Sequence, residues 1–189
     1  MNKITAIIES LCYLLVKLKK ADKIHLVKLM YLADKYHLMN YGRTITGDEY
    51  FAFPKGPGGS KTMHVLNFKK NVLKDQMNFA VKHFKKGKGY EYFPGEDCAI
   101  DQIKMLSESD IESLDFALYN FGMMDKWNAV DYTHTLPEWK KFEKLLKSGR
   151  TRKELIETTE VLSATNDKYF TVSKEHLEDS KKILTGTFD

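Results

Sequence analysis

One segment, residues 22–40, constrains the fold of this chain more than any other part of the sequence. Asp22 suits the N-cap of a helix, and Gly42 suits the position just after the end of that helix. A helix with one broad face in water keeps that face polar, whereas here apolar side chains occupy much of the circumference. These side chains are Ile24, Leu26, Val27, Leu29, Met30, Tyr31, Leu32 and Ala33. The pattern therefore predicts a central helix that other elements surround.

Further helices are available to enclose this central one. An apolar stripe between Ile4 and Leu18 predicts the first of them. Ser107 suits the N-cap of another, with acidic residues in its first turn, and Pro137 suits the first position of a later one. Shorter helical pieces are expected at about residues 126–132, 152–162 and 173–184.

The length and composition of the chain suit a single folded domain. Its 189 residues are enough to bury a core, and 42% hydrophobic with 30% charged residues is far from a disordered composition. We expect residues 1–189 to form one mainly α, compact helical fold of about six or seven helices with a small β-hairpin or extended segment. In that fold, residues 150–189 make a helical tail.

The middle of the chain has a mixed pattern. Residues 50–53 suit a short extended piece, whereas residues 54–59, Pro-Lys-Gly-Pro-Gly-Gly, are expected to be irregular. Ser60 then suits the N-cap of a helix that carries Met63, Leu66 and Leu73. For residues 79–93 two interpretations stay open: a hairpin that turns at residues 86–89, or a helix continued to Phe84.

The two cysteines and the apolar N-terminal segment bear on where the protein works. Cys12 and Cys98 form no metal-like pair and suggest no disulfide framework, so a reducing compartment, the cytoplasm, is expected. Residues 4–18 are interrupted by Glu9 and are shorter than the roughly 20 apolar residues of a membrane-spanning helix. No small-residue cleavage site follows them. We therefore expect neither a targeting segment nor a membrane span.

Charge is segregated along the chain although its net value is only +4. Residues 61–88 carry eight lysines and one acidic residue, Asp75, whereas residues 91–125 are acidic with Lys104 as the exception. This asymmetry either steers a charged partner or lets the two segments pack side by side and cancel. Arginine, the residue that reads bases best, is scarce. A solvated lysine face is therefore the preferred interpretation of the basic tract, and a nucleic-acid-binding regulator is the alternative.

The search for catalytic chemistry finds one cluster. Tyr31, Asp34 and His37 lie three residues apart on the central helix and share a face, and a histidine held by a carboxylate is the usual start of general base catalysis. No nucleophile motif, phosphate loop or histidine pair at metal-ligand spacing accompanies it. We interpret the cluster as a buried polar network that ties the helix to the turn at residues 42–50. No catalytic residue, metal or cofactor is predicted.

Two blocks of sequence carry a family resemblance. Residues 28–38, Lys-Leu-Met-Tyr-Leu-Ala-Asp-Lys-Tyr-His-Leu, and residues 41–50, Tyr-Gly-Arg-Thr-Ile-Thr-Gly-Asp-Glu-Tyr, resemble the Panacea, or SocA-like, antitoxin domain family, which includes the phage-associated GepA group. The run at 106–110 and the Thr-His…Pro-Glu-Trp segment at 133–139 resemble later family motifs. The resemblance covers about residues 5–145. It departs at the turn, where the family reads Gly-Pro-Val and this chain reads Gly56-Pro57-Gly58-Gly59-Ser60.

This resemblance implies an antitoxin that binds and neutralises a cognate protein toxin, often one encoded by an adjacent gene. Some relatives also present the toxin to a protease. The implied protein is no enzyme and needs no cofactor. The motif residues expected to form a structural network are Lys28, Tyr31, Asp34, His37, Gly42, Gly47, Asp48, Gly56, Pro57 and His134. The candidates for partner binding, which flank the family turn and the Thr-His…Trp segment, are Arg43, Tyr50, Phe53 and Trp139, the last of which also suits a core position.

Overall fold

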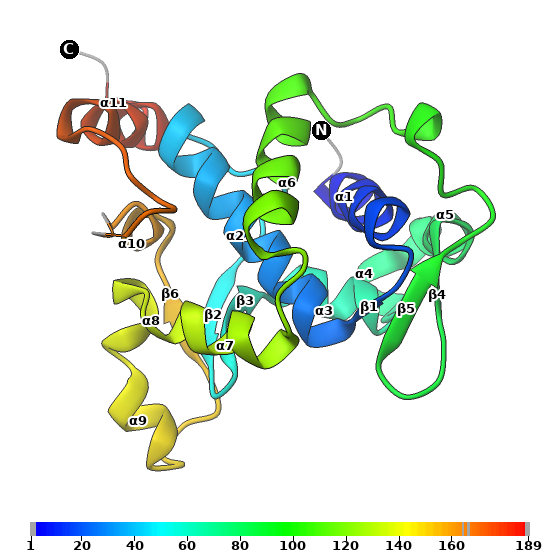
Figure 1. Cartoon of the computed structure of the whole chain (residues 1–189), viewed down its shortest axis with the longest axis horizontal. Helices are drawn as coiled ribbons and strands as arrows, with labels where there is room; N and C mark the ends of the chain where they lie inside the picture. The colour runs from blue at the N-terminus through cyan, green and yellow to red at the C-terminus, as the bar shows by residue number, and fades with distance from the viewer. Residues whose placement is uncertain (1–2, 164, 166, 188–189) are drawn as a thin grey trace.

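A single long helix, α2 (Lys23–Tyr41), runs through the middle of the molecule in this computed structural model, which describes residues 3–163, 165 and 167–187. Fourteen of the 19 residues of α2 are buried. The helices α1 (Lys3–Leu18), α6 (Glu108–Phe121), α7 (Lys126–His134) and α11 (Lys174–Thr185) pack against it (Figure 1). The prediction of a central, enclosed helix is confirmed.

The ends of the main helices are where the sequence predicts them. The Asp22 carboxylate accepts a hydrogen bond from the Ile24 amide at 2.8 Å, and Gly42 ends α2 in the left-handed region with φ of 66°. A Cβ atom at Gly42 would lie 2.5 Å from Cβ of Ile183, so glycine also lets α11 pack on this end of α2. At the start of α6, Ser107 and Asp110 form a reciprocal capping box.

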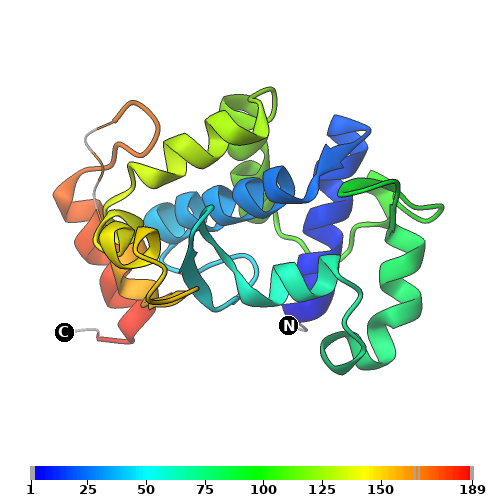
Figure 2. The same ribbon diagram turned by 90° about the horizontal axis from the view of Figure 1, so that it is seen from below.

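A three-stranded sheet lies against α2 (Figure 2), and its strand β3 also contacts α7. Its strands are β2 (Tyr50–Phe53), β3 (Gly56–Gly59) and β6 (Glu154–Ile156), in the order β3-β2-β6 and antiparallel throughout. The prediction that residues 54–59 are irregular is wrong for the last four. Gly56 turns the chain with φ of 89°, and Pro57 is tolerated because β3 is an edge strand, where a missing N–H costs little.

The basic tract folds into short helices and one strand of a second sheet. The helices are α3 (Ser60–Leu66), α4 (Lys70–Leu73), η1 (Lys74–Gln76) and α5 (Met77–His83). The sheet has the order β1-β5-β4, from β1 (Ala21–Asp22), β4 (Phe84–Lys86) and β5 (Glu91–Pro94). One helix from Ser60 past Leu73 is a wrong prediction, because the backbone takes positive φ at Phe68 and Lys74. Both interpretations of residues 79–93 hold in part: a helix runs to His83 and a hairpin follows.

The C-terminal part crosses back to the central helix. After η2 (Ile100–Gln102), α6 and α7 come α8 (Pro137–Lys140), α9 (Glu143–Lys147), β6, α10 (Thr158–Val161) and α11. A helix across residues 152–162 is a wrong prediction for its first half, which is β6. The described residues form eleven α-helical segments instead of six or seven, because several predicted helices are split. The fold is mainly helical with two small three-stranded sheets.

The two cysteines lie together, contrary to the sequence-based expectation. The structure joins Cys12 on α1 to Cys98 as a disulfide, with a Cα–Cα distance of 5.5 Å. Their separation of 86 residues gives no sign of the pairing, which depends on how residues 95–105 return to α1. Glu9 holds that return, since its carboxylate accepts hydrogen bonds from the amides of Lys104 and Met105. Among the described helices, none is both long and apolar enough to cross a membrane.

Candidate functional site

Asp34 ties the central helix to the turn before β2. Its Oδ1 accepts from the amides of Ile45 and Thr46 at 2.8 and 3.1 Å, and its Oδ2 accepts from the hydroxyls of Thr46 and Tyr50 at 2.5 and 2.9 Å. The residue is 2% exposed. Burial raises the pKa of Asp34 to about 6, against the opposing effect of these hydrogen bonds. Every oxygen is used, so this carboxylate is built into the fold.

Asp48 performs the capping that the sequence assigns to Ser60. Its Oδ1 accepts from the amides of Glu49 and Lys61, and its Oδ2 accepts from the amide of Thr62, each at 2.7 Å. Thus a carboxylate from the preceding turn satisfies the first amides of α3, and the prediction of Ser60 as N-cap is wrong. The N-cap residue is Gly59, where a Cβ would lie 2.2 Å from Oδ2 of Asp48. Only glycine lets the carboxylate come this close.

Tyr31, Asp34 and His37 do not bond to one another, but Asp34 and His37 are buried and both bond to the turn at residues 42–50, so the prediction of a network that ties the helix to this turn is confirmed for these two. His37 faces away from Asp34: its Nδ1 lies 2.8 Å from the carbonyl oxygen of Arg43, and its Nε2 lies 3.1 Å from Oδ1 of Asp110. Tyr31 donates to Glu138 at 2.6 Å. Burial acts to raise the pKa of Asp110, but hydrogen bonds from His37, Ser107 and Arg43 outweigh it and hold the pKa below its ordinary value. Asp34 and His37 thus tie α2 to the turn at residues 42–50, His37 also contacts α6, and Tyr31 joins α2 to Glu138.

A buried ion pair between Lys35 and Glu138 was missed by the sequence reasoning. Nζ of Lys35 lies 3.0 Å from Oε1 of Glu138 and also donates to the carbonyl oxygen of Val161, and both side chains are fully buried. One signal for it was present in the sequence. Lys28 and Lys35 stand seven residues apart on a helix that is apolar around its circumference, so both were placed to be buried.

Lys28 holds the β2–β3 turn against the central helix. Its Nζ donates to the carbonyl oxygen of Pro57 at 2.5 Å, and burial lowers its pKa to about 7. At Gly56 a Cβ would lie 2.6 Å from Oγ1 of Thr133 and 2.8 Å from Nζ of Lys28. Close by in sequence, His134 stacks on Trp139 with ring centroids 3.7 Å apart. The Gly-Pro turn and the Thr-His segment of the family resemblance therefore meet around Lys28.

The four candidates for partner binding fall into two groups. Arg43 keeps 45% of its side chain exposed, although it pairs with Asp110, and Phe53 is half-buried. Tyr50 and Trp139 are each 1% exposed, so placing them on a partner-binding surface is wrong. The Tyr50 hydroxyl is used by Asp34, and the Trp139 indole donates to the carbonyl oxygen of Phe53 at 2.9 Å. Their positions beside the motifs reflect internal packing.

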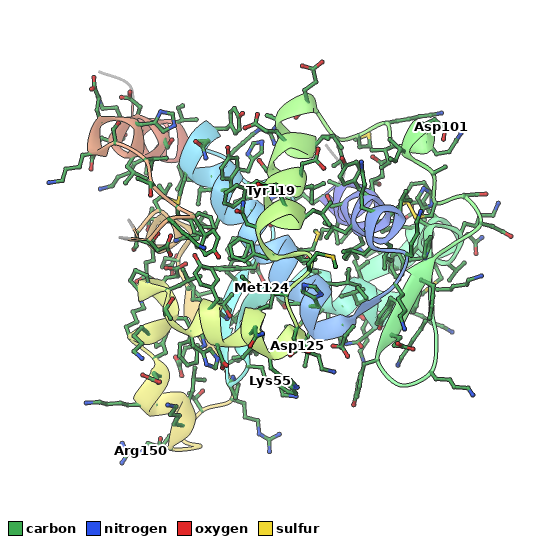
Figure 3. The ribbon with its side chains drawn as sticks, in the orientation of Figure 1. Lys55, Asp101, Tyr119, Met124, Asp125 and Arg150 are labelled. Carbon is green, nitrogen blue, oxygen red and sulfur yellow. A yellow bond between two sulfur atoms is a disulfide. The ribbon has the colours of Figure 1, made fainter. Side chains whose placement is uncertain are left out.

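Phe53 opens onto a surface cavity of about 520 Å³. The cavity lies between the start of α2, the β2–β3 turn and the start of α7, and Trp127 on α7 is 48% exposed at its side. Lys55 at the tip of the turn lies near the start of α7, with its Nζ 5.3 Å from the centre of the Trp127 ring (Figure 3). The sequence reasoning found Phe53 here but not Trp127, whose exposure depends on how α6 turns into α7.

The basic tract remains largely without acidic partners. Among ion pairs of the described residues, Lys82 with Asp97 at 3.4 Å is the one that joins residues 61–88 to an acidic side chain. The interpretation in which the two charged segments cancel therefore accounts for little of the charge. Part of the tract reaches the cavity: Lys69 and Lys86 lie close enough to Lys23 to lower its pKa further, after the larger effect of burial.

Comparison with known proteins gives one match. A family model described as "Antitoxin SocA-like, Panacea domain" matches residues 26–140, more than half of the chain. That range includes α2, the Asp34 and Asp48 turn, the β2–β3 hairpin and Trp127. No curated protein and no solved structure matches. In the described part of the chain, no group of three or more His, Cys, Asp or Glu side chains is arranged to hold a metal ion.

Proposed function

This chain belongs to the antitoxin SocA-like, Panacea domain family, and on that premise we propose that it is an antitoxin that neutralises a protein toxin by binding it directly. The family match is the observation that carries the proposal. The toxin is the product of an adjacent gene, and the two proteins meet in the cytoplasm. There, thiol reductants would open the Cys12–Cys98 link.

Neutralisation of this kind needs a surface and no catalytic group. A specific complex buries about 800 Å² on each partner, enough to cover the working surface of a small toxin. The side chains that looked catalytic in the sequence, Asp34 and His37, are committed to internal hydrogen bonds. By contrast, large apolar side chains near the α6–α7 corner are open: Tyr119 is 90%, Met123 94% and Trp127 48% exposed. Aromatic residues and methionine are typical of protein interfaces.

The proposal assigns this activity to residues 1–189 as one domain. Both α1 and α11 lie outside the matched range, yet both pack on α2. Removing either would expose part of the central helix, so the complete chain is the form to test.

Co-expression tests the proposal. The chain and the product of each adjacent reading frame are induced separately and together, and growth and co-purification are measured. We expect one neighbour to stop growth alone and to form a stable complex with this chain that restores growth. Asp48→Ala, which should strongly destabilise the fold, is the negative control. Failure of the wild-type chain to bind or rescue any toxic neighbour would contradict the proposal.

A nucleic-acid-binding regulator is the alternative, because the basic tract is largely unpaired. In that case the chain would bind duplex DNA with an affinity that falls steeply with salt, as expected when several phosphates are neutralised. Binding that disappears when Lys82, Lys85, Lys86 and Lys88 become alanine would favour this alternative over the antitoxin.

A further inference from the structure

The cavity beside Phe53 carries positive charge that the protein does not neutralise. Four lysines line it: Lys23, Lys28, Lys55 and Lys126. Among the described residues, Lys126 alone of these has a carboxylate partner, Asp22, at 2.9 Å. Lys23 donates to the Asn67 side chain and Lys55 lies over the Trp127 ring, so neither has a carboxylate beside its charge. Lys28 is instead buried against the Pro57 carbonyl, and burial lowers its pKa to about 7.

The one acidic residue on the cavity wall is already in use. Asp22 caps α2 through the Ile24 amide and pairs with Lys126. A further lysine lies beside the cavity lining: Nζ of Lys86 is 5.9 Å from the centre of the Tyr90 ring. An anion that enters would therefore meet cations from α2, the β2–β3 turn and α7 without displacing an internal ion pair of Lys23, Lys28 or Lys55.

The rest of the lining is apolar and partly aromatic. Ile24, Val27 and Met63 contribute aliphatic surface, and Phe53, Trp127 and Tyr90 contribute rings. Tyr90 is 66% and Trp127 48% exposed, whereas large aromatic side chains are on average mostly buried. Packing within the protein therefore does not explain their positions. A concave apolar surface with a few charged groups at defined places is typical of a binding site.

We propose that this cavity receives an acidic segment of the partner protein, with one apolar side chain of that segment entering between Phe53 and Trp127 and its carboxylates pairing with the lysines. This inference rests on the proposed antitoxin function and names the surface and the chemistry of its partner. Each partner carboxylate that replaces water around Lys55 or Lys23 gains a charge-assisted hydrogen bond. The buried apolar side chain excludes water from those contacts and so strengthens them.

A protein segment suits the cavity better than a nucleic acid does. A phosphate backbone is read mainly by arginine and lysine on open surfaces, and base edges are read above all by arginine. None of Arg43, Arg150 and Arg152 lines the cavity. The concave, largely apolar volume of about 520 Å³ suits one large side chain rather than a continuous row of phosphates.

The first experiment tests the chemistry of the cavity without the toxin. Anilinonaphthalene sulfonate, an apolar dye with one negative charge, is titrated into the full-length chain and followed by fluorescence. We expect one saturable site, and about tenfold weaker binding by Lys55→Glu and by Trp127→Ala. The matched controls Lys181→Glu and Leu155→Ala, at exposed positions outside the cavity, should bind within about twofold of the wild type. Absent binding, or equal binding by all variants, would overturn the inference.

Competition against the bound dye identifies the class of occupant. A short peptide with one phenylalanine between glutamates should displace the dye, and the same peptide with lysines in place of glutamates should not. Displacement by a single-stranded oligonucleotide but not by the acidic peptide would overturn the assignment to a protein partner.

The second experiment uses the toxin found by co-expression. Lys55→Glu and Trp127→Ala should lose rescue and co-purification, while Lys181→Glu and Leu155→Ala retain both. If the wild type rescues and Lys55→Glu, Trp127→Ala, Lys181→Glu and Leu155→Ala all rescue equally, the inference fails and the antitoxin function stands. If the wild type rescues from no neighbour while the dye results hold, the antitoxin function fails and the cavity keeps its assigned chemistry.

Discussion

The two ends of one strand, β2, lie in opposite surroundings. At its first residue, the Tyr50 ring is 1% exposed and its hydroxyl donates to Asp34. Three residues later, Phe53 faces an open cavity where one of four lysines, Lys126, has an acidic partner, and where the neighbouring Trp127 is half exposed. Both ends belong to the segment that the family model matches. The difference shows that some residues of the matched segment stabilise the fold and others are available for binding. Whether the side chains have hydrogen-bond partners inside the protein distinguishes the two groups.

At the Tyr50 end, every carboxylate oxygen of Asp34 and Asp48 meets an N–H or O–H group of the protein. Carboxylates whose oxygens are all hydrogen-bonded within the protein are not available to bind a ligand. Removing either carboxylate should strongly lower the free energy of unfolding. At the Phe53 end, charges and rings remain available, and their loss should spare the fold. Measurements of stability and binding on variants at the two ends of β2 can test this distinction.

The largest effect is expected from Asp48→Ala. It leaves the amides of Glu49, Lys61 and Thr62 without their acceptor, and unsatisfied groups of this kind together cost about 4 kcal/mol or more. Urea denaturation measures the free energy of unfolding. Asp125→Ala is the control, since that exposed N-cap serves one amide and should cost about 1 kcal/mol. Equal costs at the two sites would refute the special role of Asp48.

The next effect is a pH dependence at Asp34. Its folded pKa of about 6 lies above the ordinary aspartate value of 3.8, so the folded state binds the proton more tightly than the unfolded state does. Its contribution to stability is therefore present at low pH and declines as pH rises from about 4 to 6, by on the order of 3 kcal/mol. The difference in unfolding free energy between the wild type and Asp34→Asn should follow this decline. A difference that does not change with pH would exclude a raised pKa.

A smaller effect separates the two aspartates by their donors. Asparagine at 34 keeps one oxygen for the Ile45 and Thr46 amides, and its NH₂ faces hydroxyls that can rotate to accept. Asparagine at 48 would point an NH₂ group at a backbone amide whichever way it is turned. We expect Asp48→Asn to cost at least about 1 kcal/mol more than Asp34→Asn at neutral pH. The opposite order would contradict the hydrogen-bond assignment.

The smallest effect on stability is expected at the other end of the strand. Trp127→Ala removes a ring that is 48% exposed, so the free energy of unfolding should fall by less than about 1 kcal/mol. The same change should cause one of the largest losses in toxin binding. A cost as high as that of Asp48→Ala would show that Trp127 supports the fold, and the contrast between the ends of β2 would disappear.

Local signals predicted much of the first half of the fold. Asp22 and Gly42 mark the ends of α2 because capping depends on neighbours in sequence. The contact between Asp34 and the turn at residues 42–50 was also predicted, because the two lie close together along the chain. The capping of α3 by Asp48 was not predicted, because Ser60 lies nearer to the helix in the sequence and the sequence does not show how the turn folds back.

Contacts between distant segments set the limit of the sequence reasoning. Cys12 and Cys98, like Lys35 and Glu138, meet through the packing of helices far apart in the chain. Exposure has the same origin: an aromatic residue beside a motif can be core or surface, and Trp139 is core. The family resemblance identified the protein class because it depends on residue identity alone.

The strand β6 has a consequence for how this family is cut into fragments. It comes from residues 154–156, beyond the matched range of 26–140, yet it pairs with the central strand β2. A fragment that ends at residue 140 would leave the backbone groups of Tyr50 and Ala52 open on that side. Open strands of this kind recruit other copies of the same chain and lead to aggregation. By pairing with β2, the C-terminal strand β6 covers an edge that could otherwise pair with another copy of the chain, although the family match ends before β6.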